Sequence, residues 1–258
     1  MTCPVAFVTG PTSGLGAGFA HKLASLGYDL VLVARNEERL QELAAELEGK
    51  SGAQSEIIVA DLGTAEGRAA AVQRLEKGVE FLVNNAGIGI TGEFWNVEPD
   101  VLQGQLDLNV TAVMQLTRAA LPAMLAAANG RIVNVASVAG LISGRGSTYS
   151  ASKAYVVSLT EGLSGGLEGT GVKIQALCPG FVRTEFHQRA GIAMESIPGL
   201  MWLEVDDVVA TSLKDLENGK VISVPGIQYK VITTAGRIIP KSVVRKLTNV
   251  VGRGRDRT

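Results

Sequence analysis

Short runs of apolar residues rich in branched side chains recur along the chain, and longer segments with helical spacing separate them. The runs contain little alternation of polar and apolar residues, which is typical of strands buried on both faces of a sheet. Seven such strands are expected, at residues 5–8, 30–33, 57–59, 81–83, 132–135, 173–177 and 221–224.

The segments between these runs are expected to form helices. Residues 37–47 show the clearest pattern, with one apolar stripe made of Leu40, Leu43, Ala44 and Leu47. Thr64 is expected to cap the helix that follows the third strand. Strands that alternate with helices predict a parallel sheet with right-handed crossovers and helices on both faces. The predicted fold is therefore a doubly wound α/β domain.

Composition narrows the class of protein. The chain has 258 residues, 46% hydrophobic and 19% charged, and a formal net charge of −1. This balance argues against disorder and against binding nucleic acid through phosphates. Cys3, Cys178 and two histidines are too few for a disulfide framework or a four-ligand zinc site, so no metal site is expected. The sequence contains no signal-peptide pattern and no apolar run of about 18 residues, so a cytoplasmic location is expected.

The first strand runs directly into a glycine-rich turn, Thr9-Gly10-Pro11-Thr12-Ser13-Gly14-Leu15-Gly16. In open parallel sheets the first βα turn is the usual phosphate site, and backbone N–H groups at the helix N-terminus hold the anion. A plain glycine-rich turn is the alternative, but the position between a strand and a helix favours a nucleotide site. Cofactor contacts are expected from Gly10, Thr12, Ser13, Gly14, Leu15 and Gly16.

The ends of the next strands carry residues that could bind the rest of a dinucleotide. Arg35 stands near the place where an acid would bind the ribose of NAD, and Arg39 follows one helical turn later. Because an arginine suits a 2′-phosphate, NADP(H) is predicted; NAD(H), with Arg35 and Arg39 as ordinary surface arginines, is the alternative. Further cofactor contacts are expected from Asp61, Leu62, Asn85, Ala86 and Gly87.

Three side chains near the fifth strand suggest acid–base chemistry. Ser137 ends that strand, Tyr149 follows 12 residues later, and Lys153 comes four residues after Tyr149. Residues i and i+4 share one face of a helix, so the ammonium group should lie beside the phenol. A nearby cation favours the phenolate form and so lowers the pKa of the tyrosine toward the working pH. A general acid is most effective when its pKa lies near that pH.

In combination, these motifs resemble the signature of the short-chain dehydrogenases/reductases. The resemblance covers about residues 4–184 and consists of Thr-Gly-x-x-x-Gly-x-Gly, Asn-Asn-Ala-Gly, the serine of strand five and Tyr-x-x-x-Lys. It implies a Rossmann-like fold and hydride transfer between a nicotinamide cofactor and a carbonyl or alcohol. The family's catalytic tetrad would be Asn109, Ser137, Tyr149 and Lys153, with Tyr149 and Lys153 also contacting the cofactor.

The resemblance also implies roles for the segment after the sixth strand. Its turn would hold the nicotinamide carboxamide, with cofactor contacts from Pro179, Gly180, Val182 and Thr184. The substrate loop would span about 185–203, where apolar side chains indicate a hydrophobic ketone, aldehyde or alcohol. Candidate substrate contacts are Phe186, His187, Met194 and Trp202.

The C-terminal end departs from the family's pattern. Residues 1–225 are expected to form one Rossmann-like domain, and 226–258 a basic extension that is part of the same domain or a peripheral helix. The extension replaces the glycine-rich tail that helps many relatives to form tetramers, so a homodimer is expected instead. Its basic residues form either a solvated helix or a peripheral contact with anionic lipid.

Two other functions remain open from the sequence. A non-catalytic dinucleotide-binding regulatory module could use the same fold, because fold does not decide function. A lyase, epimerase or dehydratase with a bound nucleotide is a third possibility, although such relatives usually carry a separate substrate domain. The complete tetrad favours an oxidoreductase.

Overall fold

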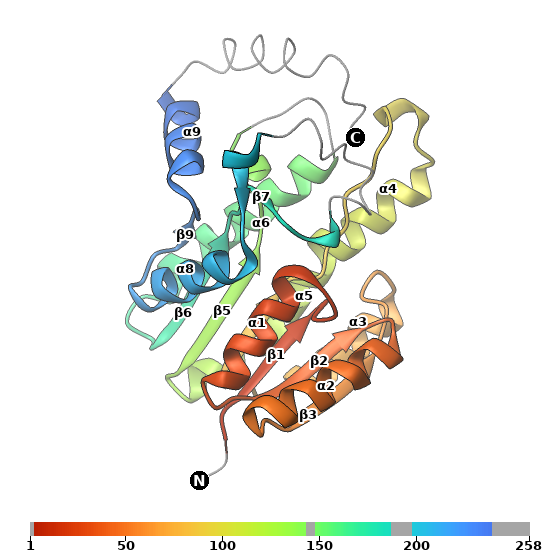
Figure 1. Ribbon diagram of the computed structural model, residues 1–258, viewed down its shortest axis with the longest axis vertical. Coiled ribbons are helices and arrows are strands. Elements are labelled where there is room, and N and C mark those ends of the chain that lie inside the picture. The colour runs from red at the N-terminus through yellow and green to blue at the C-terminus, as the bar shows by residue number, and fades with distance from the viewer. Residues whose placement is uncertain (1–2, 143–147, 187–197, 239–258) are drawn as a thin grey trace.

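The computed structural model describes residues 3–142, 148–186 and 198–238, and its centre is a seven-stranded sheet (Figure 1). The strand order is β3-β2-β1-β4-β5-β6-β9, and each neighbouring pair runs parallel. The order changes direction between β1 and β4, which makes that position the topological switch point. The strands are β1 (Val5–Thr9), β2 (Asp29–Ala34), β3 (Ser55–Val59), β4 (Phe81–Asn84), β5 (Gly130–Val135), β6 (Val172–Leu177) and β9 (Ile222–Ser223).

Helices cover both faces of the sheet, so the predicted doubly wound, Rossmann-like fold is confirmed. One face packs against α1 (Gly14–Ser25), α2 (Glu37–Ser51) and α8 (Val205–Glu217), which lie in front of the sheet in Figure 1. The other face packs against α3 (Ala65–Leu75), α5 (Val113–Ala126) and α6 (Thr148–Gly166). Phe7 and Val8 illustrate the division, since these neighbours on β1 belong to opposite core clusters.

The carboxyl ends of the strands are covered by shorter elements. The segment after β4 contains η1 (Phe94–Asn96), α4 (Pro99–Leu106) and the π-helical η2 (Asp107–Ala112), which continues into α5. A 3-10 turn, η3 (Val138–Gly140), follows β5. Beyond β6 come β7 (Phe181–Val182), η5 (Gly199–Met201) and β8 (Trp202–Leu203), and α9 (Ile227–Ile238) follows β9.

Helix caps agree with the local sequence. The side chain of Thr64 accepts a hydrogen bond from the backbone N–H of Gly67 at 3.1 Å, as predicted. Asn36 caps α2 in the same way, through the N–H of Arg39 at 2.8 Å. Gly52 ends α2 in the left-handed region with φ of 74°, where a glycine carries no steric cost.

Two strands differ from the sequence-based expectation, β3 in its burial and β9 in its length. β3 forms the edge of the sheet, and Val59 at its end is 50% exposed. β9 has only two residues, because just Ile222 and Ser223 pair with β6. A separate two-stranded pairing of β7 with β8 was not predicted, and it joins the two ends of the expected substrate loop.

Across the described ranges, no helix is long and apolar enough to span a membrane. Of the C-terminal extension, residues 226–238 are described, and residues 239–258 lie outside the described part. The predicted membrane contact of this extension and the predicted homodimer both stay predictions.

Replacing Gly16 with Ala should destabilise the fold. A Cβ at this position would lie 2.1 Å from the carbonyl oxygen of Gly10 and 2.5 Å from Nδ2 of Asn85. We expect Gly16→Ala to lower the free energy of unfolding by about 3 kcal/mol, because the clash is with backbone. Gly49→Ala is the control: nothing lies within 4 Å of its Cβ, so the change should raise stability by about 0.5 kcal/mol. Urea unfolding followed by circular dichroism measures both, and equal midpoints would contradict the prediction.

Candidate active site

Side chains join the glycine-rich turn to the end of β4. Nδ2 of Asn85 donates to the carbonyl oxygens of Thr9 and Gly10, at 2.9 and 3.0 Å. The hydroxyl of Thr9 accepts from the backbone N–H groups of Asn85 and Ala86, both at 2.9 Å. These bonds fix the two strand ends at the switch point.

The glycine-rich turn has the backbone shape that its glycines allow. Gly10 and Gly14 adopt φ of 61° and 56°, in the left-handed region. A Cβ on Gly14 would lie 3.0 Å from Cγ2 of Thr184, so glycine also lets the segment after β6 approach the turn. Ser13 occupies the N-cap position of α1 but makes no side-chain capping bond, unlike Asn36 and Thr64 at α2 and α3. The N-terminus of α1 thus has no side-chain cap and points toward the strand ends.

Lys153 is buried behind Tyr149. It is only 4% exposed, and its Nζ donates to the carbonyl oxygen of Val135 at 2.8 Å. The same Nζ lies 5.8 Å from the centroid of the Tyr149 ring. Burial lowers the pKa of Lys153 from its ordinary 10.5 to about 8, partly opposed by Cys178. The sequence spacing therefore brings the amine and the ring together, as expected.

Asn109 lies at the centre of the π-helical turn η2 and is fully buried. Its side chain binds distant parts of the chain: Oδ1 accepts from the N–H of Ile88 at 2.9 Å, and Nδ2 donates to the carbonyl oxygen of Ile88 at 2.9 Å and to Oγ of Ser152 at 3.2 Å. These bonds contradict a purely local role within the helix. A π-helical turn changes the direction of side chains along a helix, and such turns often occur at functional sites.

Gly87 of the Asn-Asn-Ala-Gly motif lies beside two members of the predicted tetrad, and the remaining member, Ser137, follows β5. A Cβ on Gly87 would lie 3.1 Å from Oδ1 of Asn109 and 3.3 Å from Nζ of Lys153. Ser137 comes two residues after β5 and caps η3, where its Oγ accepts from the N–H of Ala139 at 3.1 Å. Asn109 and Lys153 are therefore side by side, with glycine backbone next to both.

The residues predicted to bind the adenosine half lie at the ends of β2 and β3. The guanidinium of Arg35 is exposed and lies 3.8 Å from the carboxylate of Asp61. Arg39 lies 3.6 Å from the carboxylate of Glu185, which belongs to the segment after β7. Asp61 also accepts from the N–H of Gly63 at 2.9 Å, while Leu62 is buried in the core.

The expected substrate side is partly described. The ring of Phe186 lies 5.9 Å from that of Tyr149, so this candidate adjoins the predicted general acid. Trp202 packs at the base of the loop, 5.8 Å from the ring of Phe181 and 5.7 Å from the guanidinium of Arg183. His187 and Met194 lie outside the described residues.

Sequence reasoning missed several side chains around this site. Gln105, fully buried, donates to the carbonyl oxygen of Ile88 at 3.3 Å and accepts a bond from the hydroxyl of Thr148. Tyr229 of α9 bonds to the turn after β6. Neither belongs to a motif, and their partners are 17 to 48 residues away in the chain. Only the apolar spacing around them could have indicated burial.

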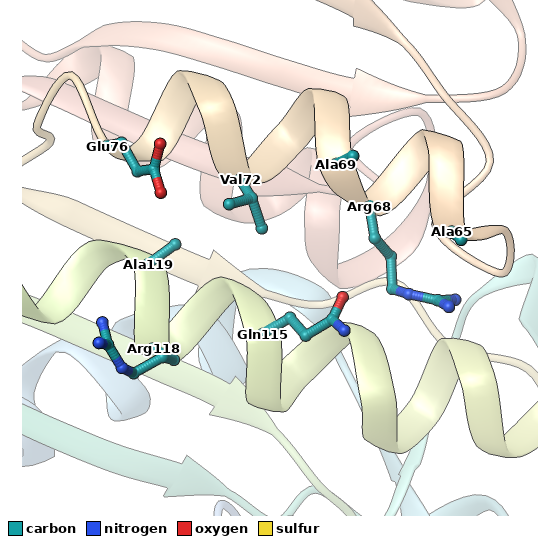
Figure 2. Close-up of a pocket in the computed structure, with 8 residues that line it drawn as sticks. All are labelled: Ala65, Arg68, Ala69, Val72, Glu76, Gln115, Arg118 and Ala119. Carbon is teal, nitrogen blue, oxygen red and sulfur yellow. The ribbon is translucent and has the colours of Figure 1, made fainter.

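A groove of about 550 Å³ lies elsewhere, between α3 and α5 (Figure 2). None of its lining residues belongs to the predicted site; they are Ala65, Arg68, Ala69, Val72, Glu76, Gln115, Arg118 and Ala119. In the part of the chain that the structure describes, no three His, Cys, Asp or Glu side chains are grouped to hold a metal ion.

Comparison with known proteins agrees with this geometry. The family model described as short chain dehydrogenase matches residues 4–194. The chain belongs to the short chain dehydrogenase family. The oxidoreductase UcpA of Escherichia coli K12 is 36% identical over 203 residues, which are 77% of this chain and 76% of that protein. The prediction of an NAD(P)-dependent enzyme of the short chain dehydrogenase family is confirmed.

Two solved structures have the same architecture. A short-chain dehydrogenase from Sphingobium yanoikuyae in complex with NADPH superposes with a TM-score of 0.83 and 35% identity, covering 91% of this chain and 93% of that one. A bulky-bulky ketone specific alcohol dehydrogenase from Comamonas testosteroni has a TM-score of 0.80 and 28% identity, with coverage of 92% and 93%.

The amine of Lys153 should titrate near pH 8 in the ligand-free protein. Burial disfavours the ammonium form, so the proton is lost at a lower pH than in an exposed lysine. Nitrogen-15 NMR of labelled lysine, with the resonance assigned by its loss in Lys153→Met, measures the midpoint. Activity that needs the ammonium group should fall as the pH rises through this value. A midpoint at the ordinary 10.5 would contradict the prediction.

Proposed function

We propose that this protein is an NADP(H)-dependent carbonyl reductase or alcohol dehydrogenase that acts on a hydrophobic ketone, aldehyde or secondary alcohol. The observation that carries the proposal is the buried amine of Lys153 beside the ring of Tyr149, at the carboxyl ends of the strands. Its hydrogen bond goes to a neutral carbonyl, so the positive charge remains available to the phenol oxygen. This pair can move a proton at a substrate oxygen.

Each member of the tetrad has a distinct role in this proposal. Tyr149 would give a proton to the carbonyl oxygen, or remove it from the alcohol in the reverse direction. Lys153 would favour the phenolate form of Tyr149 and bond the nicotinamide ribose. Ser137 would hold the substrate oxygen, and Asn109 would hold a water between Lys153 and solvent. A bound nicotinamide supplies or accepts the hydride.

The glycine turn and strand ends fit a dinucleotide. The N-terminus of α1, which lacks a side-chain cap, suits a pyrophosphate. Glycine at position 87 keeps any side chain away from Oδ1 of Asn109 and from Nζ of Lys153, the group that would bond the ribose. Arg35 is exposed, and its long ion pair with Asp61 contributes little, so the guanidinium is available to a 2′-phosphate. The NADPH complex of the Sphingobium relative supports this choice of cofactor.

A hydrophobic substrate is supported by one aromatic neighbour of Tyr149 and by exposed aromatic side chains in the segment after β4. Phe186 adjoins the tyrosine ring, and Phe94 and Trp95 are 53% and 75% exposed in the segment after β4. Large exposed aromatic side chains often mark a binding surface. The Comamonas relative is described as specific for bulky ketones, which supports the same substrate class.

Removing the phenol oxygen should abolish turnover without abolishing cofactor binding. We expect Tyr149→Phe to lower kcat by about 10² to 10⁴, the usual contribution of a general acid. Tyr155→Phe is the matched control, since Tyr155 lies on the same helix α6 and is 37% exposed. NADPH oxidation with a panel of ketones and aldehydes measures turnover, and NADPH fluorescence measures binding. Full turnover by Tyr149→Phe would favour the non-catalytic dinucleotide-binding module.

Reversing the charge at Arg35 should change cofactor preference. We expect Arg35→Asp to raise the KM for NADPH about tenfold or more, because a charge-assisted bond to the 2′-phosphate is lost. The KM for NADH should stay the same or fall. Arg118→Asp, on the α3–α5 groove of Figure 2, changes the same charge away from the strand ends and should leave both values unchanged. Equal effects of the two variants would show that Arg35 does not bind the phosphate.

A further inference from the structure

Tyr229 connects the C-terminal helix to the chain just before the expected substrate loop and to the end of that loop. The side chain belongs to α9 and is 2% exposed. Its hydroxyl accepts from the backbone N–H of Phe181 at 2.9 Å and donates to the carbonyl oxygen of Met201 at 2.5 Å. One oxygen atom thus bonds the chain just before the loop and the chain near the end of the loop.

The ring of Tyr229 lies against the turn that follows β6. A Cβ on Gly180 would come within 1.9 Å of Cζ and 2.2 Å of two further ring carbons. Glycine at position 180 therefore lets the backbone rest directly on the ring face. Burial raises the pKa of Tyr229 above its ordinary value, so the hydroxyl keeps its proton and can donate to Met201.

Other contacts hold the same two segments together. Phe181 pairs with Trp202 and Val182 with Leu203 in the β7–β8 ladder. The N–H of Arg183 donates to the carbonyl oxygen of Leu203 at 3.0 Å. These bonds close the base of the loop, and Tyr229 attaches that base to α9.

The attached segment leads directly to the site. Thr184 lies against Gly14 of the glycine-rich turn, and Phe186 lies against Tyr149. Both residues come within five positions of Phe181, whose N–H bonds to Tyr229. A shift of the base is therefore transmitted over a short, partly paired stretch of chain to the residues around the predicted nicotinamide and substrate.

We propose that Tyr229 is a positioning residue, which fixes the position of the 179–184 turn and of the base of the substrate loop relative to Tyr149. The inference rests on the proposed function, since that function assigns the turn to the nicotinamide. It makes the first part of the C-terminal extension a component of the active site. Tyr229 acts through Phe181 and Met201 and does not itself contact the reacting atoms.

The alternative is that Tyr229 only fills the core. Removing its hydroxyl distinguishes this packing role from the positioning role. Tyr229→Phe keeps the ring and removes both bonds to the loop base. Thr233→Val is the matched control: Thr233 lies one turn later on α9 and is 5% exposed. Among the described residues, its hydroxyl bonds to the carbonyl oxygens of Tyr229 and Lys230 in its own helix and to no other group. Both variants remove one buried hydroxyl from α9, so effects of that loss on the helix alone should be alike, and only Tyr229→Phe removes bonds to the loop base.

The first test is kinetic, with NADPH and the best ketone of the panel. We expect Tyr229→Phe to lower kcat/KM for the ketone about tenfold, as for two lost buried hydrogen bonds, and Thr233→Val to leave it within about twofold. With NADPH deuterated at the transferred position, the kinetic isotope effect should rise in Tyr229→Phe because hydride transfer becomes slower. Affinity for 2′,5′-ADP, which lacks the nicotinamide half, should be unchanged in both variants. Equal kcat/KM in the two variants would overturn the proposal.

The second test needs no turnover and keeps the two proposals separable. Hydrogen–deuterium exchange of the 179–184 segment should become faster in Tyr229→Phe and stay the same in Thr233→Val. Unchanged exchange in Tyr229→Phe would overturn the positioning role even if the enzyme reduces ketones. Exchange could instead become faster in Tyr229→Phe while the unsubstituted protein oxidises NADPH with no carbonyl compound of the panel. That result would support the contact made by Tyr229 and reject the proposed function.

Discussion

Thr9 and Asn85 hold the carboxyl ends of β1 and β4 together at the point where the strand order changes direction. The hydroxyl of Thr9 accepts hydrogen bonds from two backbone N–H groups at the end of β4 and donates one to the carbonyl oxygen of Val83. The side chain of Asn85 donates to the carbonyl oxygens of Thr9 and Gly10. Bonds in both directions fix the separation of the two strand ends. The glycine turn and Gly87 take their positions from this junction, because the turn follows β1 and Gly87 follows β4. Gly87 in turn lies beside Asn109 and Lys153.

The buried charge of Lys153 destabilises the folded state. A fall in pKa from 10.5 to about 8 corresponds to about 3 kcal/mol by which the folded state disfavours the ammonium group. The unfolded chain holds the proton more tightly, so this group's contribution to stability rises with pH between those two values. Below pH 8 the amine is protonated in both states, so the folded state is destabilised by the full amount. A lysine placed for stability alone would lie at the surface, so the burial of Lys153 beside the Tyr149 ring fits the proposed role of its charge.

Local patterns explain how much of this molecule could be predicted from the sequence. Buried strands, the capping residue Thr64, and the neighbouring positions of Tyr149 and Lys153 all depend on residues a few positions apart, where spacing determines geometry. The edge position of β3 could not be predicted, since exposure of Val59 depends on which strands lie beside it. Tyr229 was missed for the same reason: its partners Phe181 and Met201 are 48 and 28 residues away, and no motif marks them.

The two sides of the site are built with different rigidity. Beneath the tetrad, Asn84 and Asn134 of neighbouring strands bond to each other and to Thr117 of α5 and Thr160 of α6. This buried network ties β4 and β5 to α5, which continues from the turn of Asn109, and to α6, which carries Tyr149 and Lys153. The facing side consists of two-residue strands and turns joined at a few bonds. Because proton transfer needs fixed geometry, this buried network suits the proposed role of the side that carries Tyr149 and Lys153.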